Sequence, residues 1–261
     1  MIDIHSHILP NLDDGPDDFE TSLEMMRIAE QDGITDIIAT PHLLTNSVDK
    51  EKVKLIHSNV SLLNEIAENE KINVKLHPAS ENMASEDMTK HLLQKKTILP
   101  LNKNNRYLLI EFSLYNIPDW AELLIFQCLI DGIIPVLSHP ERIKTVIEDP
   151  SIIYDLVIKG VLCQMDAPSI TGVFGKDIQK LAFKLLQCRL IHFIGTDSHN
   201  TTTRKPVLSQ ARDKAAEIVG EKMAEILVYD NPKSVLEGSD IKGFVPKNPA
   251  NFFSLYFSKT L

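Results

Sequence analysis

Seven short apolar runs alternate with helical stretches along this chain of 261 residues. The runs are rich in Ile, Val and Leu without regular polar alternation, which is typical of strands buried on both faces. Strict alternation of strand and helix predicts a parallel sheet, and the lack of a Gly/Pro-rich linker predicts one domain over residues 1–261. The predicted strands are Ile2–His5, Ile34–Ala39, Ile72–Leu76, Tyr107–Phe112, Ile133–Leu137, Val161–Met165 and Leu190–Ile194.

Helices are predicted between these strands. One begins near Thr21 and ends at Gly33, because glycine is favoured directly after the last helical residue. Val53–Ile66 carries apolar residues at helical spacing and predicts a second. From about residue 246 we expect an irregular tail whose aromatic run, Phe252–Phe257, packs on the body of the protein. The other predicted helices are Glu86–Leu93, Trp120–Ile130, Ile152–Ile158, Lys176–Leu186 and Ser209–Val219.

Seven parallel strands can form either an open, doubly wound sheet or a closed β/α barrel. An open sheet gathers its site at a switch point between a few strands, whereas a barrel brings the ends of all its strands to one rim. In this chain nearly every predicted strand is followed by a histidine or a carboxylate. We therefore predict an α/β fold of the barrel type, with the functional residues at the carboxyl ends of the strands.

Five of the nine histidines follow predicted strands. In His5-Ser6-His7 the two imidazoles lie on the same side of an extended chain, where both can reach one metal ion. Imidazoles beside carboxylates suit Zn, Mn or Fe, and one bridging carboxylate holds two ions about 3.5–4 Å apart. The sequence therefore predicts a multi-metal site built from His5, His7, Asp14, His42, Glu81, Glu111, His139, Asp197 and His199.

Several neighbouring residues leave alternatives open. Asp13 can be a ligand in place of Asp14, or it can accept backbone N–H groups in the Asp-Asp-Gly-Pro turn. Arg142 and Arg204 can hold phosphate oxygens bidentately, or they can form surface ion pairs. Asp166 ends the sixth predicted strand and is a further candidate for the site. The histidines expected to be packed or solvated side chains that bind no metal are His57, His77, His91 and His192.

The charge disfavours a nucleic-acid-binding protein, and the positions of the cysteines exclude a thiol-dependent phosphatase. A net charge of -9 disfavours nucleic-acid binding, including an exonuclease role, although metal ions can attract an anionic substrate locally. Thiol-dependent tyrosine phosphatases place an arginine six residues after the reactive cysteine. After Cys128, Cys163 and Cys188 this chain has Ile134, Ser169 and Ile194 at those positions, so that chemistry is excluded.

The three cysteines are widely spaced and odd in number, which indicates free thiols in a reducing compartment. The first residues contain no basic region, and no apolar run approaches the roughly 18 residues of a membrane span. We therefore expect a cytoplasmic protein with no integral membrane segment.

Five motifs in order along the chain resemble the PHP (polymerase and histidinol phosphatase) superfamily: M-I-D-I-H-S-H-I-L-P, I-I-A-T-P-H, L-I-E-F, P-V-L-S-H-P-E-R and G-T-D-S-H-N. Within it, the chain resembles the manganese-dependent protein-tyrosine phosphatases of bacterial capsule and exopolysaccharide loci (CpsB/CapC-like). The resemblance runs from Met1 to about Arg204 and includes G-V-F-G-K at Gly172–Lys176. It implies a distorted seven-stranded, TIM-like PHP barrel.

The resemblance also implies three divalent ions, manganese in the first place with iron and zinc as alternatives. One ion would be held by His5, His7, Glu81 and Asp197. Glu81 would bridge to a second ion, shared with Glu111 and His139, and Asp14, His42 and His199 would hold the third. Arg142, Arg204 and His42 would serve catalysis. The implied substrate is the phosphotyrosine tail of a membrane-associated tyrosine autokinase that regulates polysaccharide synthesis.

The hypothesis for the reaction is attack on phosphorus by a hydroxide that bridges metal ions, in line with the leaving phenolate. Phenol has a pKa of about 10, so its departure needs little help from a general acid, and the sequence nominates none. The alternatives are a phosphatase of histidinol phosphate or other small phosphoesters, a metal-dependent amidohydrolase and a non-catalytic regulatory module. Glu81 stands where amidohydrolase barrels often carry a carboxylated lysine, and the complete ligand set disfavours the silent module.

Overall fold

The computed structural model describes residues 1–43, 50–95 and 97–250, which form a mixed α/β fold with parallel strands. Every predicted strand overlaps an observed one, and the structure adds two short strands, β3 and β5. One sheet has the order β1 (Ile2–Ser6), β2 (Asp36–Ala39), β4 (Lys75–Pro78). The other has the order β3 (His42–Leu43), β5 (Glu81–Met83), β6 (Tyr107–Glu111), β7 (Ile134–Ser138), β8 (Leu162–Asp166), β9 (Phe193–Gly195).

The prediction of one closed seven-stranded barrel is not confirmed, because the strands divide into two sheets. The division falls where β2 gives way to β3 across Thr40-Pro41 and where β4 gives way to β5. Proline has no N–H group and cannot continue a strand ladder. On the other side β1 and β9 are joined by two backbone hydrogen bonds of 2.8 Å, Asp197 N to His5 O and His7 N to Ser198 O. The carboxyl ends of both sheets therefore still meet.

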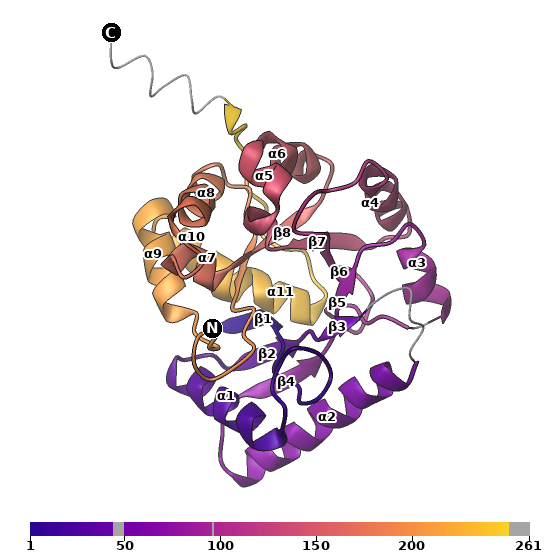
Figure 1. Cartoon of the computed structure of the whole chain (residues 1–261), viewed down its shortest axis with the longest axis vertical. Helices are drawn as coiled ribbons and strands as arrows, with labels where there is room; N and C mark the ends of the chain where they lie inside the picture. Colours follow the sequence, from indigo (N-terminus) through magenta and orange to yellow (C-terminus); the bar gives the residue numbers. More distant parts are fainter. Residues whose placement is uncertain (44–49, 96, 251–261) are drawn as a thin grey trace.

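Helices surround the strands, as the alternating sequence pattern predicts (Figure 1). Each predicted helix is present, and the stretch predicted as Glu86–Leu93 is a short α3 followed by a π-helical turn, His91–Lys95. The helices are α1 (Phe19–Gln31), α2 (Lys50–Asn69), α3 (Met88–Lys90), α4 (Ala121–Ile130), α5 (Lys144–Glu148), α6 (Ser151–Ile158), α7 (Ala167–Thr171), α8 (Lys176–Gln187), α9 (Ser209–Val219), α10 (Glu221–Glu225) and α11 (Asn231–Glu237), with a 3-10 turn at Pro140–Arg142 and a π-helical turn at Ile226–Asp230.

The strands are buried on both faces. In β6, Leu108 and Ile110 belong to the cluster that packs under the surrounding helices, whereas Leu109 belongs to a separate inner cluster. The inner cluster also contains Phe193, at the start of β9, and Val235 of α11. Helix α11 therefore packs at the amino ends of the strands and leaves the carboxyl ends to the polar residues.

A bulge in β1 directs its side chains. The pairing advances three residues along β1, from Asp3 to Ser6, but only two along β2. Such an extra residue reverses the faces of the side chains that follow it. Ile4 can therefore fill the inner cluster while His5, directly after it, also faces inward. The buried Asp3 carboxylate accepts the bulged His5 N–H at 3.2 Å and Thr196 N–H at 2.9 Å, which stabilises this backbone.

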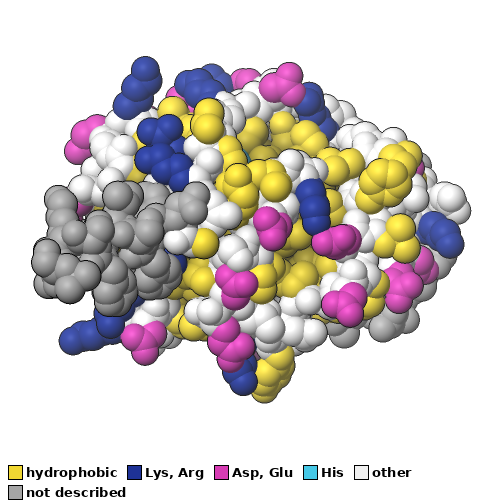
Figure 2. Space-filling view, turned by 90° about the horizontal axis from the view of Figure 1, so that it is seen from above, with side chains coloured by type: hydrophobic (Ala, Val, Ile, Leu, Met, Phe, Trp, Pro, Cys, Tyr) yellow, Lys and Arg dark blue, Asp and Glu magenta, His cyan; other side chains and the backbone are white. Residues whose placement is uncertain are grey.

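On the solvent-facing side of the helices, α4 exposes Leu123, Phe126 and Ile130, and α6 exposes Ile158. Figure 2 shows hydrophobic side chains gathered on this side of the molecule. Within the described residues, no helix combines the length and apolar character needed to cross a bilayer. The aromatic run predicted at Phe252–Phe257 lies outside the described residues. The three cysteines are free and buried, as predicted.

Candidate metal centre

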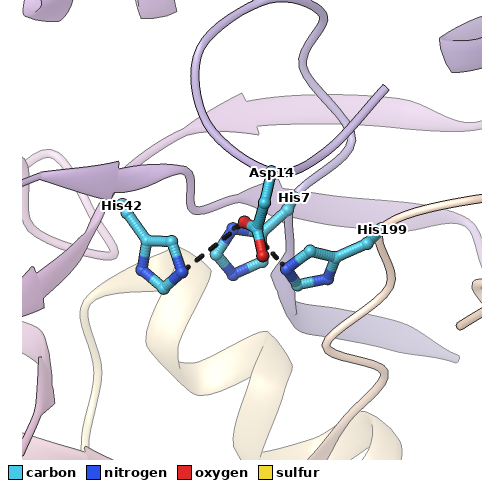
Figure 3. A group of neighbouring side chains, drawn as sticks. All are labelled: His7, Asp14, His42 and His199. Atoms are coloured by element: carbon cyan, nitrogen blue, oxygen red, sulfur yellow. Dashed lines mark ion pairs between the residues drawn. The ribbon is translucent and has the colours of Figure 1, made fainter. Parts of the chain in front are cut away.

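The structure brings the predicted ligands together where the two sheets meet. Three overlapping groups have ligand atoms within 4.8 Å of one another: His7, Asp14, His42 and His199; His5, His7 and Glu81; and His42, Glu81 and Glu111. Figure 3 shows the first group, in which the Asp14 carboxylate lies among the imidazoles of His7 after β1, His42 in β3 and His199 in the loop after β9. Parallel strands explain this convergence, because their carboxyl ends all lie at one edge.

Glu81 lies at the centre of these groups, and only 1% of its surface is exposed to solvent. Its Oε1 is 3.1 Å from His139 Nε2 and 3.4 Å from His5 Nε2. Its Oε2 is 3.0 Å from His42 Nδ1 and 3.4 Å from His7 Nε2. Burial alone would raise the pKa of Glu81, but the surrounding imidazoles hold it well below its ordinary value. A carboxylate with a different set of imidazoles at each oxygen has the arrangement needed to bridge two cations.

Asp197 connects the imidazoles to both arginines. Its Oδ1 is 3.4 Å from His7 Nε2 and 3.6 Å from His5 Nε2. Its Oδ2 accepts a hydrogen bond of 2.9 Å from Arg142 Nη1 and another from Arg204 Nη2. The backbone of Asp197 is left-handed, with φ 49°, a conformation that is uncommon for non-glycine residues.

The remaining ligands lie nearer the solvent. The Asp14 side chain is 60% exposed, with Oδ1 3.2 Å from His199 Nε2 and 3.6 Å from His42 Nε2. Glu111 is 3.7 Å from His139 Nε2 and 3.5 Å from His42 Nδ1. The side chains predicted to share an ion therefore lie close together in each of the three predicted ligand sets. His42 also lies beside Glu81 and Glu111, and His7 beside Asp14, so the division of ligands among individual ions stays a prediction.

Asp13 and Asp14 have different roles. Asp13 Oδ2 lies 2.7 Å from His7 Nδ1 and accepts the His42 N–H at 2.8 Å, so it holds two ligand-bearing segments while Asp14 faces the site. The tight loop requires Gly15, because a Cβ there would lie 2.2 Å from His7 O.

Hydrogen bonds at Nδ1 orient the imidazoles. His5 Nδ1 lies 2.8 Å from Gln164 Oε1, and His199 Nδ1 lies 2.9 Å from the Asp197 carbonyl oxygen. These acceptors place the proton on Nδ1 and leave Nε2 free to bind a metal. Gln164 was missed by the sequence analysis, although a polar residue inside the apolar run Val161–Met165 is a signal that could have identified it.

The residues fit a set of divalent cations. His5 Nε2 and His7 Nε2 face each other at 3.2 Å, although the Nδ1 atom of each already has an acceptor. Two buried atoms, Glu81 Oε2 and His199 Nε2, make no well-aligned hydrogen bond with the described residues, although His42 Nδ1 and Asp14 Oδ1 lie 3.0 and 3.2 Å from them. Lone pairs that converge in this way are stabilised by a cation, and imidazole with carboxylate is a ligand set for Mn, Fe or Zn.

We expect Asp13→Ala to weaken metal binding about tenfold to a hundredfold, because His7 would lose the carboxylate that fixes its proton on Nδ1. The measurement is a calorimetric titration of the metal-free protein with Mn²⁺. Asp17→Ala, an exposed change in the same loop, is the control and should leave the affinity unchanged. Equal affinities for the two variants would contradict a supporting role for Asp13.

Protons compete with metal at this site. Burial alone would lower the pKa of His7, but Asp13 and Glu81 outweigh it and raise the pKa to about 9. Burial also opposes protonation of His139, where Asp166 and Glu81 raise the pKa to about 9. Without metal, the protonated imidazoles of His7 and His139 stabilise the folded protein. This contribution is fully present below the ordinary histidine pKa of about 6.5 and is lost as the pH rises through about 9.

Metal affinity should therefore rise steadily from pH 6 to about pH 9, and binding should release protons. Titrations with Mn²⁺ in buffers of different ionisation enthalpy measure both quantities. An affinity that is constant over this range would contradict protonation of the ligand imidazoles.

Two residues support Arg142. Asp166 Oδ2 accepts a hydrogen bond of 3.0 Å from Arg142 Nη1, and the Phe174 ring centroid lies 4.8 Å from the guanidinium carbon. Asp166, a candidate from the sequence, therefore lies beneath the arginine. Phe174 comes from the G-V-F-G-K segment. The side chains of Arg142 and Arg204 are only 20% and 24% exposed, so their pairs with Asp197 are not ordinary surface ion pairs.

The other four histidines lie apart from these groups. His77 pairs with Asp36 at 2.8 Å, and His91 Nδ1 lies 2.8 Å from Thr97 Oγ1. His192 Nδ1 accepts the Cys163 N–H, and burial lowers the pKa of His192 to about 4. His57 is an exposed residue of α2.

Residues 1–237 match the family model for capsular polysaccharide synthesis proteins CpsB/CapC. The tyrosine-protein phosphatase YwqE of Bacillus subtilis is 40% identical over 204 residues, covering 78% of this chain and 79% of the relative. The putative tyrosine-protein phosphatase CapC of Staphylococcus aureus is 34% identical over 251 residues, covering 94% of this chain and 95% of that protein.

A solved structure from work on YwqE of B. subtilis and CpsB of Streptococcus pneumoniae, described as unique metal-dependent tyrosine phosphatases, superposes with a TM-score of 0.88. It is 35% identical and covers 95% of this chain and 99% of its own. N-isopropylammelide isopropylaminohydrolase of Burkholderia multivorans, 11% identical with a TM-score of 0.51 over 95% of this chain and 77% of its own, shares the fold alone.

Proposed function

The chain belongs to the CpsB/CapC family and is a metal-dependent tyrosine phosphatase of that type, and from this premise we propose that it hydrolyses phosphotyrosine at the site around Glu81 and Asp197. The observation that supports this location is that Asp197 contacts both the imidazoles of the candidate metal centre and the two arginines. One carboxylate oxygen faces His5 and His7, while the other accepts from Arg142 and Arg204. A phosphate on the arginines would therefore lie directly beside the metal ligands.

The protein groups have distinct tasks in this reaction. Divalent ions held by the imidazoles and carboxylates would lower the pKa of water towards neutrality and withdraw charge from the phosphoryl oxygens. Arg142 and Arg204 would bind the equatorial phosphate oxygens bidentately, with Asp166 and Phe174 keeping Arg142 in place. Phenolate leaves readily, so the absence of an assigned general acid does not prevent the reaction.

The finer assignments extend this proposal. Four carboxylates beside five imidazoles, counting Asp197 and His139 next to the three overlapping groups, favour manganese over softer metals, and the three groups support three ions. His42, which lies between two of these groups, would serve both metal binding and catalysis. We propose that residues 1–261 form a single domain. Its substrate would be the phosphotyrosine tail of a membrane-associated tyrosine autokinase, met in the cytoplasm, where free thiols such as these persist.

The test compares purified protein before chelation, after chelation and after return of Mn²⁺, with p-nitrophenyl phosphate and a phosphotyrosine peptide as substrates. We expect activity to disappear on chelation and to return with manganese. Histidinol phosphate is the competing substrate, and a kcat/KM higher than that for the peptide would contradict the proposal. Activity that survives complete metal removal would contradict the metal-dependent mechanism.

A further inference from the structure

A cavity of about 250 Å³ lies beside the candidate metal centre. One wall comes from α7 and the segment after it, with Pro168, Thr171 and Val173. The other wall comes from the loop after β9, with Thr202, Thr203 and Lys205. We call it the flanking pocket.

Each wall of the flanking pocket is directly connected to a phosphate-binding arginine. Val173 precedes Phe174, whose ring supports the Arg142 guanidinium. Thr203 and Lys205 are the chain neighbours of Arg204. Consecutive Cα atoms are about 3.8 Å apart, so the pocket begins one residue from Arg204, and on its other wall one residue from the ring that contacts Arg142. A peptide with its phosphate at Arg142 and Arg204 would place a neighbouring side chain near this pocket.

The chemistry of the flanking pocket suits an acidic side chain. Among the described residues that line it there is no Asp or Glu, although the chain as a whole has a net charge of -9. Lys205 is exposed on its wall, and Lys214 Nζ donates to Thr171 O at 3.2 Å. The hydroxyls of Thr171, Thr202 and Thr203 already donate to Ala167 O or to Asn200 Oδ1, so Lys205 is the group in this wall that would attract an acidic side chain. The larger cavity, of about 390 Å³, lies between α3 and α4 and is lined by three carboxylates, Glu86, Asp87 and Asp131, against one cation, Lys90, so its charge disfavours an acidic group.

We propose that the flanking pocket binds an acidic residue next to the phosphotyrosine of the substrate peptide, with Lys205 as its charge partner. This inference rests on the proposed function and assigns a sequence preference to the same site. An exposed ion pair of this kind contributes modestly, so the preference should be about three- to fivefold in kcat/KM and should weaken at high salt.

The experiment uses the manganese-loaded full chain and peptides with a single phosphotyrosine. The residues on either side of it are Glu in one set and Gln in the other, so that the two sets differ in charge but hardly in size. The ratio of kcat/KM for the Glu peptide to that for the Gln peptide is measured for three proteins: wild type, Lys205→Glu and Lys180→Glu. Lys180 lies on α8, exposed and outside the pocket. Its replacement by Glu changes the net charge by the same amount as Lys205→Glu.

We expect a ratio above one for the wild type and for Lys180→Glu, and a ratio below one for Lys205→Glu. A wild-type ratio of one, or the same reversal in both variants, would overturn the inference, since the second result would reflect net charge alone. Hydrolysis of the Gln peptide by the wild type tests the proposed function separately, because that peptide needs no contact with Lys205.

Discussion

Replacing Glu81 by Gln should lower kcat for an aryl phosphate by about a thousandfold or more. The change keeps the size of the side chain but removes the charge that lies within 3.4 Å of His5, His7, His42 and His139. An amide cannot replace a carboxylate that bridges cations, so metal content should fall together with the rate. Metal analysis of the purified variant and steady-state kinetics at saturating Mn²⁺ measure the two effects.

The matched control for this change is Glu86→Gln, in the same region of the chain but exposed to solvent. It should retain full metal content and activity. Circular dichroism should show both variants folded, because the two apolar clusters of the protein do not include Glu81. A Glu81→Gln protein that binds a full complement of metal and turns over normally would exclude Glu81 as the central ligand.

The second large effect is expected at the arginines. Arg142→Lys should lower kcat/KM for an aryl phosphate by about a hundredfold to a thousandfold, because an ammonium group cannot reproduce a bidentate guanidinium. Lysine would also lose the planar contact with Phe174 and part of the pairing with Asp166 and Asp197. Arg204→Lys should act in the same direction.

Unlike Glu81→Gln, these two variants should keep their metal, since neither arginine is a ligand. Metal analysis therefore separates loss of phosphate binding from loss of the metal centre. Arg106→Lys is the control, because Arg106 lies at the amino end of β6, where it bonds to Gly238 O and Asp240, away from the carboxyl ends of the strands. Full activity of Arg142→Lys would show that a simple positive charge is sufficient at that position.

The strands and the gathering of the predicted ligands at one edge were predictable because both depend on short stretches of sequence. Runs such as Tyr107–Phe112 are apolar without alternation, and the structure places β6 there, buried on both faces. Parallel strands share one carboxyl edge, so residues near those ends meet. This is why His5 near the end of β1, Glu81 in the short strand that follows β4 and His139 directly after β7 lie together although they are far apart in the chain.

The closure of the sheet was not predictable in the same way. The sequence favoured one closed barrel, whereas the structure has two sheets that separate where β2 passes into β3. The bulge in β1 was also missed, because a strand pattern assumes strict alternation. Both features depend on how neighbouring strands pair, and that pairing is decided by packing between distant segments.

The sequence by itself determined which chemical groups lie at the strand ends, since local periodicity and residue type are sufficient for that. Only the tertiary structure decided how those groups are oriented. It selected Asp13 to support His7 and left Asp14 to face the imidazoles, and it joined His5 to Gln164 across 159 positions of the chain. The physical reason is that a hydrogen bond tolerates only a few tenths of an ångström of variation in its donor–acceptor distance, and such positions are set by the packing of the whole chain and not by any short segment.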